Sequence, residues 1–97
     1  MKKQTLISVI IPIYNESATF LKLIKKILNV KTNKCKFQII IVESNSNDGT
    51  REQVKSLKKN KFDIILQPKA LGKGSAVIQG LKKAKGEIIL IQDGDLE

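Results

Sequence analysis

Four short runs of branched apolar residues recur along the chain, and a segment with helical periodicity separates each run from the next. The runs occupy residues 5–12 (TLISVIIP), 37–42 (FQIIIV), 63–66 (DIIL) and 87–91 (EIILI). Runs of this length that consist mainly of branched apolar residues are typical of strands that are buried on both faces of a parallel sheet. Strands that alternate with helices predict a Rossmann-like, doubly wound parallel α/β sheet.

Helices are expected in each of the three intervals between these strands. Ser17 is a suitable N-cap for a first helix that reaches about Leu28. A turn-rich segment follows the second strand, and a second helix then begins at Asp48 or Thr50 and reaches about Lys59.

The third helix is expected to open at residues 72–75 (GKGS) and to end at Gly86 in a left-handed cap conformation. Helical spacing also predicts which side chains face the sheet. They are Phe20, Leu21, Ile24, Ile27 and Leu28 on the first helix, Val54 and Leu57 on the second, and Val77, Leu81 and Ala84 on the third.

Right-handed crossovers determine how such strands are ordered. If the first three strands step in one direction with two helices on one face, the third helix returns along the other face and brings the fourth strand beside the first. The expected strand order is therefore 3-2-1-4. Ligands of doubly wound sheets bind beyond the carboxyl ends of the strands where the order reverses, here between the first and fourth strands. Residues 14–16 (YNE) and 93–95 (DGD) lie at these two ends.

Acidic residues gather just after the predicted strands, although the chain has 18 basic residues and only nine acidic ones. The residues at strand ends are Glu16, Glu43, Asp93, Asp95 and Glu97. Neighbouring carboxylates repel one another, and a hard divalent cation such as Mg²⁺ or Mn²⁺ relieves this repulsion. We therefore expect Asp93, Asp95 and Glu97 to hold a metal ion. The alternative interpretation of residues 92–97 (QDGDLE) is a solvated acidic turn.

Length and composition limit the classes of function. The chain has 97 residues, the size of one domain, and a formal net charge of +9, which suggests an acidic partner. With no histidine and one cysteine, it forms no internal disulfide, no Cys/His zinc site and no histidine-based catalytic site.

We expect a cytoplasmic location, because no run is long enough to span a bilayer. Nucleic acid is not an expected partner, because the few aromatic residues are not interleaved with lysines.

Lysines near residue 72 suggest a phosphate contact without a known phosphate-binding loop. Residues 72–75 lack the glycine and hydroxyl spacing of a P-loop. Lys73 and Lys69 can still add positive charge near a phosphate, and the alternative is that both are ordinary solvated lysines. Tyr14 is expected to be a stacking surface, with simple packing at a strand end as the alternative.

Four segments together resemble the family 2 inverting glycosyltransferases of the GT-A fold, and among them the dolichyl-phosphate mannosyltransferase-like members. The segments are 9–16 (VIIPIYNE), 42–50 (VESNSNDGT), 71–76 (LGKGSA) and 92–97 (QDGDLE). Each segment is weak alone, but their order and spacing are specific, and the resemblance covers essentially the whole chain. It implies that residues 1–97 are the nucleotide-sugar-binding half of a GT-A domain, truncated just after the DxD segment.

The resemblance also implies roles for individual residues. The family positions that hold the base and ribose of the donor correspond to Pro12, Tyr14 and Glu16. The metal-binding DxD segment and the position two beyond it correspond to Asp93, Asp95 and Glu97. The family usually has two adjacent aspartates after the second strand, where this chain has Glu43 and Ser44. One acidic contact is therefore longer here, and a hydroxyl that can still bind a base replaces the other.

The function implied by the resemblance is transfer of a sugar from a nucleotide-diphosphate sugar to an acceptor, which is lipid-linked in some members. The metal ion acts as Lewis acid on the leaving diphosphate. In this family the general base lies in the C-terminal half, so we expect it beyond Glu97. The alternatives are a nucleotide- or metal-binding module without catalysis and, less favoured, a basic nucleic-acid-binding domain. The exposed lysines are consistent with a peripheral location at the inner face of a membrane or with a solubilising surface.

The fourth strand is expected to be an edge of the sheet. Only one helix covers the neighbouring face, and residues 88–91 are apolar on both faces. An unpaired apolar edge is a template for strand pairing. We therefore expect either self-association or a partner chain that supplies the missing half.

Overall fold

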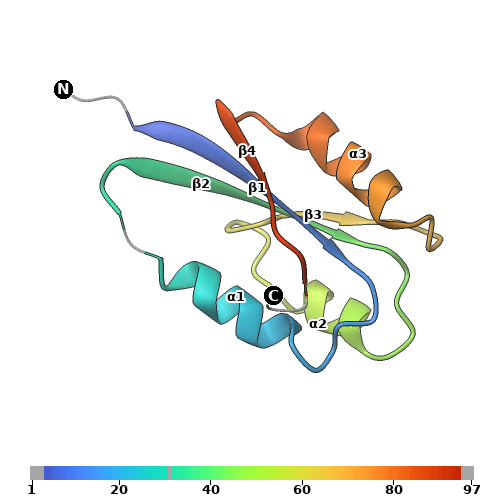
Figure 1. Ribbon diagram of the computed structural model, residues 1–97. Coiled ribbons are helices and arrows are strands. Elements are labelled where there is room, and N and C mark those ends of the chain that lie inside the picture. The colour runs from blue at the N-terminus through green and yellow to red at the C-terminus, as the bar shows by residue number, and fades with distance from the viewer. Residues whose placement is uncertain (1–3, 31, 95–97) are drawn as a thin grey trace.

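A computed structural model describes residues 4–30 and 32–94 of the chain. Within these residues, four parallel strands form one sheet in the order β3-β2-β1-β4, with a helix between consecutive strands (Figure 1). The strands are β1 (Thr5–Ile13), β2 (Cys35–Glu43), β3 (Asp63–Leu66) and β4 (Ile88–Ile91), and the helices are α1 (Phe20–Leu28), α2 (Thr50–Lys55) and α3 (Lys73–Lys83). The predicted doubly wound parallel sheet and strand order 3-2-1-4 are confirmed.

The central strands β1 and β2 are longer than predicted, and they pair along their whole length of nine residues. Pro12 lies inside β1 although proline donates no backbone N–H. On one side, β1 pairs with β4, and the N–H of Gln92 donates a hydrogen bond to the Ile10 carbonyl. The pairing between β1 and β4 ends there, before Pro12. Pro12 is tolerated because no neighbouring strand remains on that side to accept a hydrogen bond from it.

Apolar side chains of β1 and β2 alternate between two cores, one on each face of the sheet. α1 and α2 cover one face and α3 covers the other, as the right-handed crossovers predict (Figure 1). The larger core, on the α1 and α2 side, contains Val9, Ile11, Ile13, Phe20, Leu23, Ile24, Ile39, Ile41, Val54 and Phe62. The smaller core, on the α3 side, contains Ile10, Ile40, Val42 and Ala76.

The buried face of α1 differs from the predicted one. Phe20, Leu23 and Ile24 are buried and Ile27 packs against the same core, which is the spacing of one helix face. The inclusion of Leu21 and Leu28 in this face was wrong, because both lie on its flank and are 49% and 46% exposed.

The predicted end of α1 at Leu28 and the predicted start of α2 at Thr50 are confirmed, whereas the start of α1 and the end of α2 differ from the prediction. α1 begins at Phe20 with Thr19 as N-cap, and the backbone N–H of Ser17 instead donates a hydrogen bond to the Asp48 carboxylate. α2 ends at Lys55 rather than near residue 59. Leu57 lies beyond the helix but still packs against the larger core.

α3 approaches the sheet through small residues rather than through the predicted Val77 and Leu81. Ala76 and Gly80 are its buried residues, whereas Leu81 is 44% exposed. A Cβ atom at Gly80 would lie 2.5 Å from Cγ2 of Ile10, so the helix backbone rests directly on the β1 side chain. Only small residues leave room for this close contact, so the face of α3 that carries Leu81 points away from the sheet.

Gly86 does not adopt the predicted left-handed cap conformation, because the positive φ values among the described glycines belong to Gly49 and Gly72. Ala84, in extended conformation, is the C-cap of α3. Gly86 instead lies against β1, where a Cβ atom would come within 2.6 Å of the backbone N of Ser8. The glycine therefore permits close approach of the α3–β4 connection to the sheet.

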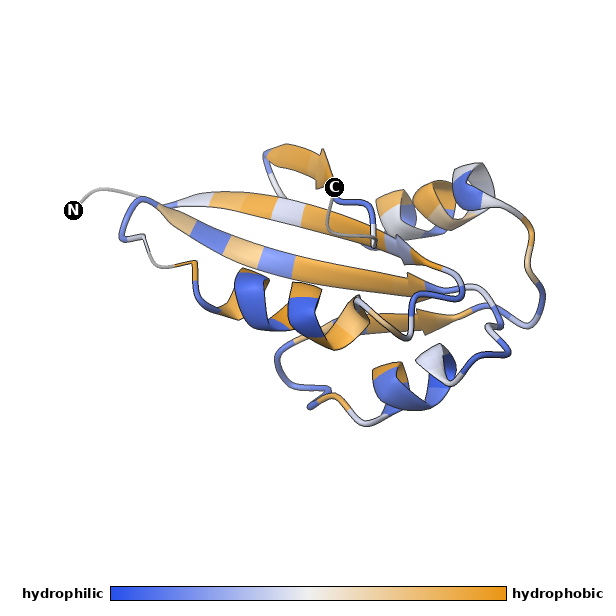
Figure 2. Ribbon diagram, turned by 60° about the horizontal axis from the view of Figure 1, so that its bottom comes forward, coloured by the Kyte–Doolittle hydropathy of each residue, from blue (hydrophilic) through white to orange (hydrophobic). Residues whose placement is uncertain are grey.

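β4 is an edge strand, and the expectation that it is buried on both faces was wrong. Its four residues, Ile88, Ile89, Leu90 and Ile91, are between 42% and 51% exposed. Figure 2 shows β4 as an entirely apolar strand at the margin of the sheet. In the part of the chain that the structure describes, no helix is long and apolar enough to cross a membrane.

Candidate functional site

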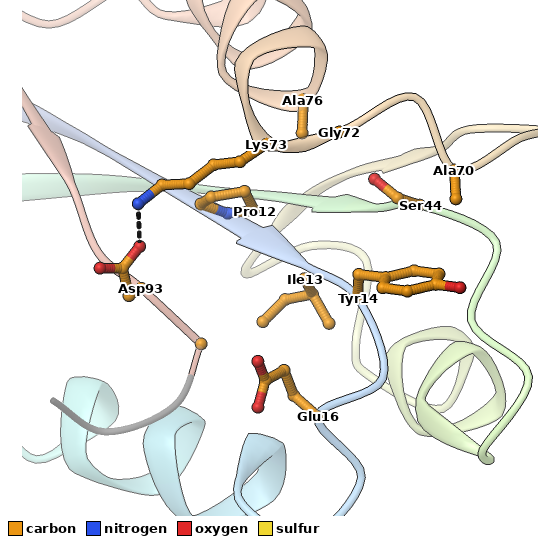
Figure 3. Close-up of a pocket in the computed structure, with 11 residues that line it drawn as sticks. Pro12, Ile13, Tyr14, Glu16, Ser44, Ala70, Gly72, Lys73, Ala76 and Asp93 are labelled. Carbon is orange, nitrogen blue, oxygen red and sulfur yellow. Dashed lines mark hydrogen bonds and ion pairs between the residues drawn. The ribbon is translucent and has the colours of Figure 1, made fainter.

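A cavity of about 470 Å³ opens beyond the carboxyl ends of β1 and β4, where the strand order reverses. We call it the β1–β4 pocket. It is lined by Pro12, Ile13, Tyr14, Glu16, Ser44, Ala70, Gly72, Lys73, Ala76, Asp93 and Gly94 (Figure 3). Its position is the one that the sheet topology predicts for a ligand site.

The turn after β1 presents Tyr14 and Glu16 to the pocket. Asn15 between them has a positive φ of 51°, which is uncommon outside glycine and reverses the chain direction. Its backbone N–H donates to Oγ of Ser46 at 2.8 Å, and its side-chain oxygen accepts from the N–H of Asn47 at 3.0 Å. The β2–α2 loop therefore holds this turn in place, and Tyr14, which lines the pocket, is 47% exposed.

The segment after β4 closes the opposite side of the pocket. Gly94 is buried, and its carbonyl accepts a hydrogen bond from Oγ1 of Thr19 at 3.0 Å. A Cβ atom at Gly94 would lie 2.4 Å from Cδ1 of Ile13, so a larger residue would require this buried side chain or the segment after β4 to shift. Asp93 forms an ion pair with Lys73 at the start of α3, and both side chains remain about half exposed (Figure 3).

Glu43 lies beneath the pocket rather than in its lining. The side chain is fully buried and accepts hydrogen bonds from the backbone N–H groups of Asn45 at 3.0 Å and Ser46 at 2.6 Å. It also pairs with the guanidinium of Arg51 at 2.6 Å. Arg51 in turn donates to the carbonyl of Gln67 at 2.9 Å, so one carboxylate joins the end of β2 to α2 and to the segment after β3.

Ser44 is the residue of this segment that reaches the pocket. Its hydroxyl donates to Oε1 of Gln67 at 2.6 Å, and Nε2 of Gln67 donates to Oγ of Ser75 at 3.3 Å. Ser44 and Gln67 are both nearly buried. The second candidate lysine, Lys69, is exposed and does not line the pocket, whereas its neighbour Ala70 does.

Asp48 connects the turn after β1 with the start of α2. Its carboxylate accepts hydrogen bonds from the hydroxyl and the N–H of Thr50 and from the N–H of Ser17. These bonds, led by that of the Thr50 hydroxyl, lower the pKa of Asp48 from 3.8 to about 2. The N–H of Glu16 donates to Oγ1 of Thr50, so this network also supports the β1 turn.

Sequence reasoning missed Arg51 and Gln67, which carry much of the support for the pocket. Arg51 has a visible signal, because it is the sole arginine among 18 basic residues. A chain that otherwise uses lysine has little reason to place an arginine except where its planar, multidentate donor group is needed. Gln67 follows β3 directly, which is a position at the ligand edge of a parallel sheet.

The glycosyl transferase family 2 model matches residues 8–97 of this chain. The chain belongs to this family. Dolichol-phosphate mannosyltransferase of Pyrococcus furiosus is 36% identical to this family 2 chain over 92 residues, which is 94% of the chain and 26% of the relative. Glycosyltransferase AglE of Haloferax volcanii is 30% identical over 91 residues, 92% of the chain and 30% of the relative. The family 2 chain thus spans less than a third of these relatives.

Solved structures confirm the GT-A architecture of this family 2 chain. Mannosyltransferase PcManGT of Pyrobaculum calidifontis, solved with GDP-mannose and Mn²⁺, matches with a TM-score of 0.77 and 25% identity. That match covers 96% of this chain and 28% of the mannosyltransferase. S. aureus TarS in complex with UDP matches with a TM-score of 0.81 and 26% identity, over 92% of this chain and 27% of the other.

The metal ligands that the sequence predicts for this family 2 chain lie mostly outside the described residues. Asp95 and Glu97 fall there, and among residues 4–30 and 32–94 no group of three or more potential ligands gathers to hold a metal ion. Asp93 and Glu16 do line the pocket. Their carboxylate oxygens have the chemistry that a hard divalent cation prefers, so the described part of the site fits such an ion.

Proposed function

We propose that this chain binds the donor of a glycosyltransferase, a nucleotide-diphosphate sugar, in the β1–β4 pocket. The observation that carries this proposal is the pocket itself, which joins an exposed aromatic ring and a cation at the point where the sheet order reverses. Pro12 and Tyr14 would contact the base and ribose together with Ser44. Lys73 would approach the diphosphate.

The metal part of the proposal assigns Mg²⁺ or Mn²⁺ to Asp93, Asp95 and Glu97. A bound divalent cation neutralises the charge that grows on the diphosphate as it leaves the sugar. Asp93, which follows β4, forms an ion pair with Lys73, so a metal ion held there would lie at the same end of the pocket as this lysine. Support comes from relatives, since PcManGT was solved with Mn²⁺ and GDP-mannose, and glucosyl-3-phosphoglycerate synthase of Mycobacterium tuberculosis with Mn²⁺ and UDP.

Glu43 has a different role in this proposal from the direct base contact that the family pattern implies. Its carboxylate is buried and engaged by Arg51 and two backbone N–H groups. We therefore assign it as a positioning residue, which fixes the loop that carries Ser44 into the pocket.

The proposal for the complete reaction is transfer of the sugar to an acceptor that is lipid-linked, with a general base outside residues 1–97. The acceptor class is supported by the name of the P. furiosus relative, a dolichol-phosphate mannosyltransferase. Exposed lysines on α1, such as Lys22, Lys25 and Lys26, suit a peripheral position at an anionic cytoplasmic membrane surface. Equal sedimentation with anionic and neutral vesicles would remove this location. The second candidate function, nucleotide and metal binding without catalysis, needs only the β1–β4 pocket.

The chain's partner is proposed to be a further strand beside β4. Its outer edge has no paired neighbour among the described residues, and its side chains are about half exposed. The strand would come from a second copy of the chain or from the part of a GT-A domain that lies outside residues 1–97.

Calorimetry with UDP or GDP in the presence and absence of Mn²⁺ tests the donor and metal proposals. We expect measurable affinity only when nucleotide and metal are both present, because the carboxylates need diphosphate oxygens to complete the coordination sphere. Asp95→Ala should weaken metal-dependent binding at least about tenfold, the loss expected when a charged ligand is removed. Glu52→Ala, which removes an exposed acid from α2, is the matched control. Unchanged binding in Asp95→Ala would contradict the role of Asp95.

A further inference from the structure

Thr19 is the N-cap residue of α1, but its side chain does not cap the helix. A threonine at this position ordinarily accepts a hydrogen bond from a backbone N–H of the first helical turn. Within residues 4–30, the Thr19 side chain makes no such bond. Its hydroxyl instead donates to the carbonyl oxygen of Gly94 at 3.0 Å. The stabilisation that capping gives a helix is therefore replaced by a contact with the segment after β4.

The single hydrogen of the Thr19 hydroxyl is committed to Gly94. Oγ1 of Thr19 also lies 3.4 Å from Oε2 of Glu16, which lines the β1–β4 pocket. A hydroxyl has one hydrogen, and the two oxygens of an O–H···O bond are ordinarily about 2.5–3.0 Å apart. The carbonyl at 3.0 Å meets this limit, whereas the carboxylate at 3.4 Å does not. Removal of the hydroxyl therefore removes the bond to Gly94.

Gly94 has little freedom to move within the space that it occupies. It is buried, and an added Cβ atom would lie 2.4 Å from Cδ1 of Ile13 and 3.3 Å from Cγ of Glu16. This packing limits the position of the Cα atom, but the permissive backbone of a glycine still lets its carbonyl turn. The bond from Thr19 fixes the direction of that carbonyl, and hence of the peptide plane that contains it.

Thr19 projects from a segment that is itself held in place. The N–H of Ser17 donates to the Asp48 carboxylate at 3.2 Å, and the N–H of Glu16 donates to Oγ1 of Thr50 at 3.0 Å. The N–H of Thr19 donates to the carbonyl of Glu16 at 3.1 Å. The hydroxyl of Thr19 therefore extends from a fixed backbone, as the supporting contact of a binding site requires.

Lys73 and Thr19 hold the segment after β4 in different ways. Lys73 pairs with the carboxylate of Asp93 (Figure 3), and both side chains are about half exposed. Thr19 bonds a backbone oxygen one residue further along the chain and occupies no carboxylate. The contact from Thr19 is therefore compatible with a ligand on Asp93, whereas Lys73 uses the same carboxylate that is proposed to bind a metal ion.

We infer that Thr19 is a positioning residue for the metal ion of the proposed function. The inference rests on that function, in which two of the ligands, Asp93 and Asp95, flank Gly94 in the sequence. Through the carbonyl of Gly94, Thr19 sets the peptide plane between these two acidic residues and so limits the directions in which their carboxylates leave the backbone. When a contact that orients metal ligands is removed, metal affinity typically falls by about tenfold to a hundredfold.

Calorimetric titration of UDP at a series of Mn²⁺ concentrations tests this inference. The quantity compared between variants is the Mn²⁺ requirement, the Mn²⁺ concentration at which UDP affinity reaches half of its maximum. Thr19→Val keeps the shape of the side chain and removes the hydroxyl, so it should raise this requirement about tenfold or more. UDP affinity at saturating Mn²⁺ should stay close to that of the unmodified chain, because the residues that line the pocket are unchanged. Thr19→Ser retains the hydroxyl and should restore the Mn²⁺ requirement of the unmodified chain.

Thr32→Val is the matched control and should leave the Mn²⁺ requirement unchanged. Oγ1 of Thr32 accepts a hydrogen bond from the N–H of Lys34 in the loop before β2, at the opposite end of the sheet from the pocket. Thermal melts show whether each variant is folded. If Thr19→Val is not folded, Thr19→Ala carries the test with the same expectation.

An unchanged Mn²⁺ requirement in Thr19→Val overturns the inference and leaves the donor proposal standing, even if the melting temperature falls. An equal loss of UDP affinity at every Mn²⁺ concentration also overturns it, because Thr19 would then support the pocket rather than the metal ion. The same raised requirement in Thr19→Ser overturns it as well, since the hydroxyl would not be the cause. Absence of Mn²⁺-dependent UDP binding in the unmodified chain overturns both the inference and the donor proposal.

Discussion

At the scale of single residues, the part of the site within residues 4–30 and 32–94 contains two ion pairs in opposite environments. Glu43 and Arg51 pair with side chains that are 0% and 20% exposed, whereas Lys73 and Asp93 pair with side chains that are 58% and 50% exposed. Removing one partner of a buried pair leaves an uncompensated charge in a medium of low dielectric constant. Exposed pairs gain little, because water screens both charges. The two pairs should therefore differ sharply in their contribution to stability.

Arg51→Leu is expected to lower the free energy of unfolding by about 3 kcal/mol or more, since it leaves the Glu43 carboxylate buried without its partner. Asp93→Asn should cost less than about 1 kcal/mol, because water replaces the exposed partner. Urea unfolding of the two variants and the unmodified chain measures both values. A cost for Arg51→Leu as small as that for Asp93→Asn would contradict the structural role of the buried pair.

Asp48 gives the stability a pH dependence. Its folded pKa of about 2 lies below the ordinary 3.8, so it stabilises the fold fully above pH 3.8 and loses this contribution as the pH falls toward 2. Asp48→Asn removes the ionisable group. The difference in melting temperature between the unmodified chain and this variant should therefore shrink as the pH falls through that interval. A difference that is constant from neutral pH to pH 2 would contradict the hydrogen bonds assigned to the ionised carboxylate.

At the scale of elements, α3 contains two glycines with opposite structural demands. A Cβ atom added at Gly74 would meet no atom within 4 Å, whereas one added at Gly80 would lie 2.5 Å from Ile10. Gly74→Ala should stabilise the chain by about 0.5 kcal/mol, because alanine has the higher helix propensity. Gly80→Ala should cost about 1–3 kcal/mol despite the same gain, since Ile10 is fully buried and cannot move away. Thermal unfolding of both variants tests this, and equal shifts would show that α3 does not rest on β1.

Sequence reasoning succeeded for elements where local pattern and topology agree. The apolar runs and the right-handed crossover rule gave the strands and their order, and strand order gave the position of the pocket. Sequence reasoning failed for residues whose role depends on a single close contact in the folded structure. Gly86 has the sequence position of a helix cap, yet its role is close approach to Ser8. Glu43 ends β2, where a ligand contact is expected. It is instead buried beside Arg51, a residue of α2 that the pattern of the strands does not reveal.

At the scale of the whole molecule, the apolar residues of β4 are not covered by the described part of the chain. Each is 42% exposed or more, and an open apolar edge favours pairing with another strand. Burial of a few hundred Å² at such an edge contributes several kcal/mol, at roughly 25 cal/mol per Å². This is comparable with the entire stability of a small domain.

We therefore expect the chain to associate as its concentration rises, and Leu90→Lys to reduce that association by placing a charge on the edge strand. Sedimentation across a concentration series is the measurement. Asn60→Lys, which adds the same positive charge at an exposed residue before β3 at the opposite edge of the sheet, is the control for altered net charge. A monomer at all concentrations, with a melting temperature independent of concentration, would contradict the proposed partner strand.

The contact between Lys73 and Asp93 gives the pocket an internal counter-ion. The ammonium group satisfies the carboxylate at the tip of β4 from the first residue of α3. If Asp93 holds the proposed metal ion, the ion competes with this amine for the carboxylate, and an amine released from Asp93 is available to a phosphate. Under this proposal, the metal ion replaces Lys73 at Asp93, and Lys73 then pairs with the phosphate. Binding of the metal ion and binding of the nucleotide therefore favour each other. Linkage requires that UDP raise the affinity for Mn²⁺ by the same factor by which Mn²⁺ raises the affinity for UDP. Lys73→Met should reduce that factor, because it removes the group that changes partners.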